Sequence, residues 1–359
     1  MRSMLCIALA LAACGGSDEE TTTTTTTTTT GGTEAAVSPI PEGYHSVTPH
    51  LVVADVNAAL AWYASALGAQ QTELVAGPDG QPMHAEMRIG DSVVMLGPEN
   101  EEHGMRAPTS LEGSCGALMV YVEDVDATVA AAIEAGATAA MPVGDMFWGD
   151  RYGQITDPHG HRWGVATHKF DAPPSEMGAR AAAWGQAMAA GEPSPTYEDP
   201  PASHWQPAEM HTITPSLVVT GAADIDTYIA AFGAEEVSRT MTPQGMLMHA
   251  ELRFGDSVVM FSQASAEMDG YMKTPSQLGG IPYNVMLYVE DADATHAQAV
   301  SAGATSAAPV QEMFWGDRWG VVTDAAGHMW GIATHVIDLS AEQIQQRMME
   351  QFGGEAPQG

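Results

Sequence analysis

A His-x-Glu-x-Arg pattern occurs twice in the chain, as His84, Glu86 and Arg88 and again as His249, Glu251 and Arg253. Residues spaced by two share one face of a β-strand, so the three polar side chains of each copy are expected to point the same way. Burial would raise the pKa of such a Glu and the neighbouring Arg would lower it, which permits general-base chemistry. Glu86 and Glu251 are therefore candidate bases, and the His and Arg residues are candidate ligand contacts.

Two other interpretations fit the same pattern. The residues between the polar ones (Met83, Ala85, Met87 and Ile89) are apolar. These apolar residues would face the helices, while the His, Glu and Arg side chains only balance one another's buried charges within the sheet. His84 and Glu86 are also metal-ligand types, although two ligands are too few to define a site. The pattern leaves these readings open.

A Trp-Gly-Asp-Arg motif is also repeated, and its candidate ligand contacts are Trp148, Asp150, Arg151, Trp315, Asp317 and Arg318. The indole could stack on a ligand while the Arg engages a carboxylate or phosphate. The structural alternative, which we favour, is that Trp covers the core edge and Asp pairs with Arg around a tight Gly turn. The nearby His161, His168, His328 and His335 are typical of hydrogen-bonded structural histidines.

An internal duplication must position these motifs. Residues 84–95 recur as residues 249–260, an offset of 165, and residues 146–151 recur as 313–318, an offset of 167. A fixed offset of this kind indicates a duplicated structural unit. The duplication covers nearly the whole globular part of the chain.

Each copy shows the order strand, helix, three strands, twice over. In the first copy the pattern predicts a strand at 51–53, a helix at 56–67 ending at Gly68, a strand at 118–122, a helix at 126–135 ending at Gly136, and strands near 153–156 and 162–167. The predicted fold class is therefore α+β, with four βαβββ modules. Further helices are expected at 175–190 and 341–352.

The length of 359 residues suggests two domains joined by a linker rich in proline. The predicted boundaries are a signal peptide at 1–13, a Thr-rich tether at 14–42, a first domain at 43–170, a helix and linker at 171–209, a second domain at 210–338, and a C-terminal helix and tail at 339–359.

The N-terminus has the layout of an export signal. Arg2 precedes a short apolar run that ends in Leu-Ala-Ala-Cys, which resembles a bacterial lipobox and implies lipid attachment at Cys14. Ordinary secretion is the alternative. We expect a protein anchored in the bacterial cell envelope, at the outer membrane because Gly15 is not the Asp typical of inner-membrane retention. Of the three cysteines, Cys115 then has no disulfide partner and is expected to be a core residue.

The charge balance restricts the partners. The chain has 45 acidic and 12 basic residues, a formal net charge of −33. This charge repels phosphate backbones, so a nucleic-acid partner is not expected. An acidic surface that keeps an exported protein soluble is the simpler interpretation.

Several motifs together resemble the vicinal oxygen chelate superfamily, and within it PhnB-like glyoxalase and bleomycin-resistance proteins. They are TPHLVVAD at 48–55, YVED at 121–124, FWGDRYG at 147–153, DPHG at 157–160 and GVATH at 164–168. The resemblance implies βαβββ modules that pair into cup-shaped sheets. Whether the modules pair within a copy or between copies is left open.

Enzymes of this superfamily hold a divalent metal between their paired modules. The resemblance places the four ligand positions near Thr48, Met95, Ala117 and Gly164 in the first copy, and near Thr214, Met260, Asn284 and Gly331 in the second. Met, Ala and Gly cannot supply the oxygen or imidazole donors that such a metal prefers. We therefore expect no metal cofactor at the usual site.

The expected function is binding of a small organic molecule, as in the sequestering resistance proteins of the superfamily. The alternatives are a lyase, isomerase or dioxygenase of glyoxalase type, with Glu86 or Glu251 as base and an atypical metal site, and a scaffold without any ligand. The two repeats are expected to pair as an intramolecular pseudo-dimer, with further homo-oligomers left open.

Overall fold

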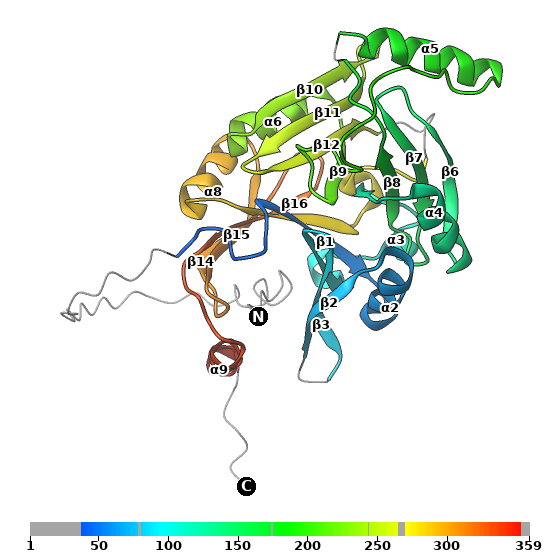
Figure 1. Cartoon of the computed structure of the whole chain (residues 1–359). Helices are drawn as coiled ribbons and strands as arrows, with labels where there is room; N and C mark the ends of the chain where they lie inside the picture. Colours follow the sequence, from blue (N-terminus) through cyan, green and yellow to red (C-terminus); the bar gives the residue numbers. More distant parts are fainter. Residues whose placement is uncertain (1–36, 78–79, 174, 243, 265–269, 353–359) are drawn as a thin grey trace.

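The computed structural model describes residues 37–77, 80–173, 175–242, 244–264 and 270–352. The predicted signal peptide, Cys14 and the Thr run lie outside these residues. The described part contains four βαβββ modules in two mixed sheets (Figure 1), which confirms the predicted fold class. Among the described residues, no helix combines the length and the apolar composition that crossing a lipid bilayer requires.

The first repeat contributes modules 1 and 2. Module 1 consists of β1 (Val47–Val53), α2 (Val56–Leu67), β2 (Gln70–Ala76), β3 (Pro82–Ile89) and β4 (Ser92–Pro98). Module 2 consists of β5 (Gly116–Tyr121), α4 (Val125–Glu134), β6 (Thr138–Asp145), β7 (Asp150–Thr156) and β8 (Arg162–His168). A 3-10 turn (Glu101–His103) and α3 (Pro108–Leu111) connect the modules, and α5 (Met177–Ala190) follows them.

The second repeat contributes modules 3 and 4. Module 3 consists of β9 (Ile213–Val219), α6 (Ala222–Phe232), β10 (Glu235–Met241), β11 (Leu247–Phe254) and β12 (Ser257–Gln263). Module 4 consists of β13 (Tyr283–Tyr288), α8 (Ala292–Ser301), β14 (Thr305–Glu312), β15 (Asp317–Thr323) and β16 (Met329–His335). The short α7 (Pro275–Leu278) precedes module 4, and α9 (Ala341–Phe352) follows it.

Local sequence explains the helix ends. The carboxylate of Asp55 accepts a hydrogen bond from the backbone N–H of Ala58 at the start of α2, and Gly68 ends this helix in the left-handed conformation. Both α2 and α9 have the predicted bounds. Helix α4 begins and ends one residue earlier than predicted, and α5 begins two residues later.

The two sheets each combine modules from different repeats. Sheet 1 has the strand order β14-β15-β16-β13-β1-β4-β3-β2, and sheet 2 has the order β10-β11-β12-β9-β5-β8-β7-β6. Module 1 therefore pairs with module 4 through β1 and β13, while module 2 pairs with module 3 through β5 and β9. The two repeats thus form an intramolecular pseudo-dimer, and the pairing runs between repeats.

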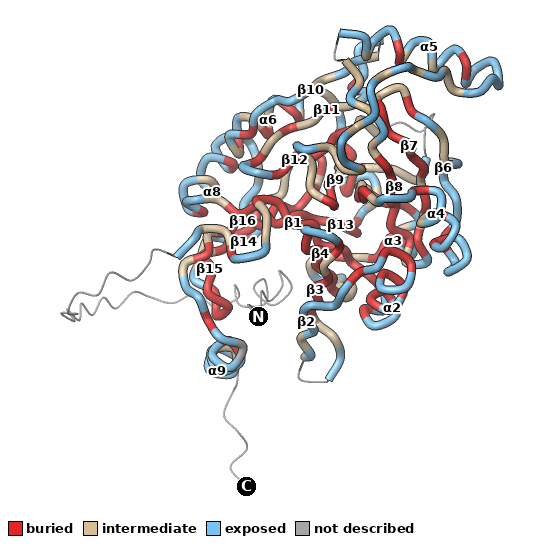
Figure 2. Tube along the Cα trace, in the orientation of Figure 1, coloured by how far each residue is buried: buried red, intermediate tan, exposed pale blue. Residues whose placement is uncertain are grey.

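One large core joins the helix-covered faces of both sheets. Figure 2 shows the buried residues concentrated in the central strands, with the outer surfaces of the helices exposed. The carboxylate of Asp157 lies in this core and accepts hydrogen bonds from Tyr63 Oη (2.8 Å) and Trp163 Nε1 (2.9 Å). Cys115 is buried here, as expected, and burial raises the pKa of its thiol.

The opposite faces of the sheets are the two cups. Cup 1 is the inner face of sheet 1 and cup 2 is that of sheet 2. A chain segment crosses each cup: strap 1 (residues 37–46) precedes module 1, and strap 2 (residues 203–212) precedes module 3. The backbone N–H of His335 bonds to Pro39 O (3.0 Å), and that of His168 bonds to Trp205 O (2.8 Å). Each strap is therefore tied to the last strand of the partner module.

Candidate functional site

Cup 1 contains a buried chain of polar side chains. Glu86 on β3 accepts a hydrogen bond from Tyr44 Oη of strap 1 (2.5 Å), and its other oxygen lies 3.2 Å from His84 Nε2. His84 is 0% exposed and Glu86 is 3% exposed. Burial and the nearby Glu86 raise the pKa of Tyr44 well above its ordinary value. The Tyr44 hydroxyl of strap 1 thus donates a hydrogen bond to the candidate base.

A second polar pair lies across the joint between the two modules. His50 on β1 stands opposite Asn284 on β13, and His50 Nδ1 lies 3.1 Å from Asn284 Nδ2. The rings of His50 and His84 stack with centroids 6.5 Å apart, which brings the two polar groups together. Asn284 Oδ1 is buried and has no hydrogen-bond partner among the described residues. One repeat supplies the histidines and the other supplies the amide.

Trp319 on β15 forms the aromatic wall of cup 1. Its indole Nε1 is also buried, and no group in the part of the chain that the structure describes forms a hydrogen bond with it. A Cβ atom added to Gly331 would lie 3.0 Å from this Nε1 and 3.0 Å from Met286 Sδ. The indole thus fills the space next to Gly331, and its N–H lies beside this glycine.

Cup 2 has the same backbone but different side chains. Met210 replaces Tyr44, Ser216 replaces His50, Ala117 replaces Asn284 and Tyr152 replaces Trp319. Tyr152 Oη has a partner, because it accepts a hydrogen bond from Gln154 Nε2 (2.6 Å). The wall of this cup consists of aromatic rings and thioethers: Met119, Tyr121, Met141, Met146, Trp148, Trp184, Trp205 and Met210 pack in one cluster.

The second candidate base lies at a more open place. Glu251 Oε1 lies 3.1 Å from His249 Nε2, and the side chain of His249 is 39% exposed. Burial acts to raise the pKa of Glu251, but its hydrogen bond with His249, together with smaller contributions, holds the pKa below the ordinary value. Glu251 is therefore a carboxylate over a wide range of pH.

The arginines of both predicted patterns lie away from the cups. Arg88 donates to the backbone oxygen of Gly43 in strap 1 (3.2 Å), and Arg253 donates to Glu209 in strap 2 (2.8 Å). Both residues therefore fasten the straps.

The arginines of the Trp-Gly-Asp-Arg motifs pair with helices outside the cups. Arg151 bonds to Asp126 and Asp145, and Arg318 bonds to Asp293. These guanidinium groups link β7 to α4 and β15 to α8. Their hydrogen bonds lower the pKa values of Asp126 and Asp293.

The Trp and Asp residues of these motifs form a hydrogen-bonded unit at the rim of each cup. Asp317 accepts from Trp315 Nε1 (3.1 Å) and Tyr288 Oη (3.2 Å), and it pairs with His335 Nδ1 (2.7 Å). The equivalent Asp150 makes the same contacts with Trp148, Tyr121 and His168. These aspartates pair with a histidine from the last strand.

These histidines are held by carboxylates on both sides. Asp171 lies beside His168, and the hydrogen bond to Asp150 is the main cause of the raised pKa of His168. Burial acts to lower the pKa of His335, but hydrogen bonds to Asp317 and Asp338 outweigh it and raise the pKa. Burial raises the pKa of Asp317 itself.

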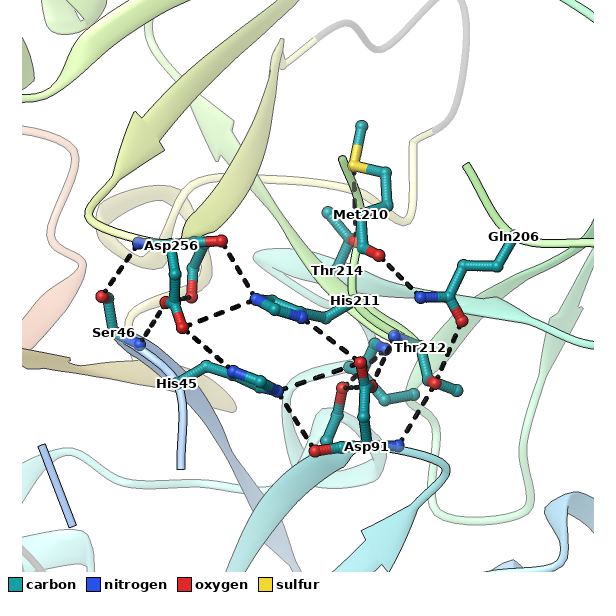
Figure 3. Close-up of polar contacts among 12 residues, drawn as sticks. His45, Ser46, Asp91, Gln206, Met210, His211, Thr212, Thr214 and Asp256 are labelled. Carbon is teal, nitrogen blue, oxygen red and sulfur yellow. Dashed lines mark hydrogen bonds and ion pairs between the residues drawn. The ribbon is translucent and has the colours of Figure 1, made fainter. Parts of the chain in front are cut away.

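A further polar cluster joins the two sheets outside the cups (Figure 3). His45, which precedes β1, and His211, which precedes β9, stack with ring centroids 3.4 Å apart. Asp91 and Asp256, from the β3–β4 and β11–β12 turns, flank the two rings. Sequence reasoning missed this cluster, although each residue recurs in the second repeat at an offset of 165 or 166.

The comparisons with known proteins identify the family. The model of the Glyoxalase/Bleomycin resistance protein/Dioxygenase superfamily matches residues 43–165 and 217–332. The chain belongs to this superfamily. The two matched ranges correspond to the two repeats, in agreement with the resemblance noted from the motifs.

Relatives of this superfamily match one repeat or both. Proteins of Mycobacterium bovis and Mycobacterium tuberculosis, both described as uncharacterized, are 40% identical over 144 residues, which is 40% of this chain and 95% and 85% of those proteins. Glyoxalase I from Zea mays has a TM-score of 0.54 at 12% identity, over 86% of this chain and 96% of that chain. At this identity the likeness shows the fold alone.

The modules pair between repeats, so each cup combines metal-ligand positions of the superfamily from both repeats. Sheet 1 brings together Thr48, Met95, Asn284 and Gly331, and sheet 2 brings together Ala117, Gly164, Thr214 and Met260. At Gly164 an added Cβ would lie 2.8 Å from the ring of Tyr152. In both cups an aromatic ring therefore occupies the space beside the glycine.

Proposed function

We propose that cup 1 binds a small polar organic molecule without the divalent metal of the superfamily. The observation that carries this proposal is the pair of buried, unpartnered polar atoms Asn284 Oδ1 and Trp319 Nε1. A buried polar group without a partner costs about 1–3 kcal/mol, so it calls for an explanation. A ligand that pairs with both atoms provides one.

The two atoms define the chemistry of the ligand. Trp Nε1 is a donor only, and Asn284 Oδ1 is an acceptor because the Nδ2 of the same amide faces His50. The ligand must therefore carry both an acceptor and a donor, as a hydroxy acid or an amide does. Its apolar part would contact Met95, Met286 and the Trp319 ring.

The residues at the superfamily's metal positions support a metal-free cup. Among Thr48, Met95, Asn284 and Gly331, none offers an imidazole or a carboxylate. A longer side chain at Gly331 would also collide with the Trp319 indole. Thr48 and Asn284 offer two neutral oxygens, and Met95 and Gly331 offer no hard donor, so these four residues do not supply the ligand set that a hard divalent cation needs.

The test is a thermal-shift screen of the full chain against a panel of small hydroxy acids, amides and diols. A compound that binds the folded chain raises the unfolding midpoint by mass action. We expect hits whose shifts disappear in Asn284→Ala and Trp319→Phe. The controls are Ser216→Ala, at the cup 2 residue paired with the Asn284 equivalent Ala117, and Tyr152→Phe, at the equivalent of Trp319; both should keep the shifts.

Hits that survive both cup 1 variants but disappear in the cup 2 variants would contradict the proposal and assign binding to cup 2. A panel without any hit, repeated with amino acids and short peptides, would favour the scaffold alternative. Isothermal titration of the best hit then gives the stoichiometry, which should be one molecule per chain.

A catalytic role of Glu86 is the second candidate. The observation that favours it is the buried chain Tyr44–Glu86–His84, in which a carboxylate contacts a hydroxyl and an imidazole at once. Such a carboxylate could move a proton on a bound carbonyl compound. Incubation of a cup 1 ligand in heavy water should then give deuterium exchange that Glu86→Gln abolishes. Exchange that persists in Glu86→Gln would remove this candidate.

We also propose that the chain is exported and anchored by lipid at Cys14, on the basis of Leu-Ala-Ala-Cys and the Thr run that follows. Expression in a bacterial host should place the full chain in the membrane fraction. Cys14→Ser should release the chain from that fraction, and mass spectrometry of the wild type should show a diacylglycerol adduct at this residue.

A further inference from the structure

Four side chains from four separate segments meet between the two sheets, outside both cups (Figure 3). His45 Nδ1 lies 3.1 Å from Asp256 Oδ2, and His211 Nδ1 lies 3.3 Å from Asp91 Oδ2. The crossed contacts are longer, 4.0 Å from His45 Nε2 to Asp91 Oδ2 and 3.8 Å from His211 Nε2 to Asp256 Oδ2. Each carboxylate Oδ2 thus lies near one nitrogen of each ring.

The other carboxylate oxygens are held by backbone N–H groups of the straps, strap 1 for Asp256 and strap 2 for Asp91. Asp256 Oδ1 accepts from the N–H of Ser46 (2.7 Å), and Asp91 Oδ1 accepts from the N–H of Thr212 (2.8 Å). The hydroxyls of Ser257 and Ser92 donate to the same two oxygens. These bonds orient each carboxylate and leave its Oδ2 directed at the imidazoles, which is how outer-shell partners prepare metal ligands.

Oxygen atoms with negative or partial negative charge surround the two imidazole rings. The second nitrogen of each ring faces a backbone oxygen: His45 Nε2 lies 3.1 Å from Asp91 O, and His211 Nε2 lies 3.0 Å from Asp256 O. Two carboxylates and two carbonyl oxygens therefore surround two imidazoles. In the described part of the chain no Lys or Arg side chain forms an ion pair with these carboxylates, and the only atom of Asp91 to which Arg88 Nη1 donates is the backbone oxygen (3.4 Å). A cation between the rings and Oδ2 would balance this charge.

We propose that His45, His211, Asp91 and Asp256 form a site for one divalent transition-metal ion that links the two sheets. Ligand atoms of His45, Asp91 and His211 already lie within 4.8 Å of one another. Imidazole and carboxylate ligands in a set of four suit Zn²⁺ and its neighbours Ni²⁺ and Cu²⁺ better than Mg²⁺ or Ca²⁺, which prefer oxygen ligands alone. The carboxylates are about half exposed, so the ion can enter from solvent.

Binding requires a movement of the rings. The two imidazoles are nearly parallel, with 14° between their planes, and a metal bound to a histidine lies in the plane of the ring. The rings must therefore turn apart before both nitrogens can reach one ion. The cavity beside them, lined by both histidines, Val93 and Val258, has a volume of only about 10 Å³, so the rings must turn toward the solvent, to which both side chains are 22% exposed. Loss of ring stacking is thus a signature of binding.

The test is isothermal titration of the full chain, stripped with a chelator, with zinc sulfate at about pH 7.5, where an ordinary histidine is neutral. We expect one zinc ion per chain, and a loss of affinity of at least about tenfold in His45→Ala and in His211→Ala. The matched control is His249→Ala, because His249 also lies beside a carboxylate but has no second histidine there.

A second readout separates ligand loss from misfolding. The unfolding midpoint of each variant is measured without metal, and in wild type zinc should raise this midpoint and shift the ring resonances of His45 and His211 by nuclear magnetic resonance. Absence of zinc binding, equal loss in His249→Ala, or binding that survives both histidine variants would each overturn the proposal. The cup 1 variant Asn284→Ala should bind zinc like wild type, so this test is independent of the ligand proposed for cup 1.

Discussion

The two cups have the same strand arrangement, in which two modules pair through their first strands, yet they hold different side chains. In cup 1 the strap, the first strand and the partner module supply Tyr44, His50 and Asn284. The His50–Asn284 contact is buried, and the Tyr44–Glu86 hydrogen bond is partly buried. The equivalent residues of cup 2, Met210, Ser216 and Ala117, cannot build such a network. The burial differs accordingly, since the His84 side chain is 0% exposed and that of His249 is 39% exposed.

The regions outside the cups show the opposite behaviour. The His–Asp cluster between the sheets, the Asp–His pairs at the rims and the core aspartates Asp157 and Asp324 have the same partners in both repeats. These contacts are therefore the same in both repeats, whereas the side chains inside the two cups differ. This difference favours distinct tasks for the two cups, and the following variants test it.

The largest difference is expected between the two glutamates. Glu86→Ala removes the acceptor of Tyr44 and His84 in a buried place, so it should lower the free energy of unfolding by about 2–4 kcal/mol. Glu251→Ala, at the more open position, should cost about 1 kcal/mol or less. Urea unfolding of both variants measures the difference. Equal losses would mean that the two cups are energetically equivalent.

The contact between strap 1 and cup 1 should have the next largest effect. Tyr44→Phe keeps the ring but removes the hydroxyl that donates to Glu86, which should cost about 1–3 kcal/mol because a buried carboxyl oxygen loses its partner. Amide hydrogen exchange of residues 38–44 should become faster as the strap loosens. The control is Met210→Leu in strap 2, which should leave exchange unchanged in both straps.

The rim histidines should stabilise both cups with the same dependence on pH. The folded-state pKa of His168 is raised, so its contribution to stability is full below the unfolded pKa of about 6.5 and is lost as the pH rises through the folded pKa. The pKa of His335 is raised in the same direction. The difference in unfolding midpoint between wild type and His168→Gln, or His335→Gln, should therefore shrink as the pH rises from about 5.5 to about 8.5. A difference that grows with pH would contradict the assignment.

The smallest effects are expected at the motif arginines. Arg151→Ala and Arg318→Ala each break exposed ion pairs with a helix, so each should cost less than about 1 kcal/mol, and the two values should be alike. Neither variant should change the binding of a cup 1 ligand. A loss of that binding in Arg318→Ala alone would show that the Arg318 guanidinium contacts the ligand after all.

The sequence by itself determined the modules and much of their local structure. The fixed offset of the duplication, the apolar spacing of α2 and the glycine after it are local signals, so the predicted bounds of α2 and α9 match the structure. The strand alternation likewise placed His84 and Glu86 on one side of β3, because side chains of a strand alternate whatever the strand pairs with.

The tertiary structure alone decided which modules pair and what meets in each cup. Each βαβββ module leaves the edge of its first strand open, and no local pattern states whether β1 pairs with β5 or with β13. The approach of Tyr44 to Glu86, of His50 to Asn284 and of His45 to His211 joins residues far apart in the sequence. Local periodicity carries no information on such contacts, because their partners are set by the packing of whole modules.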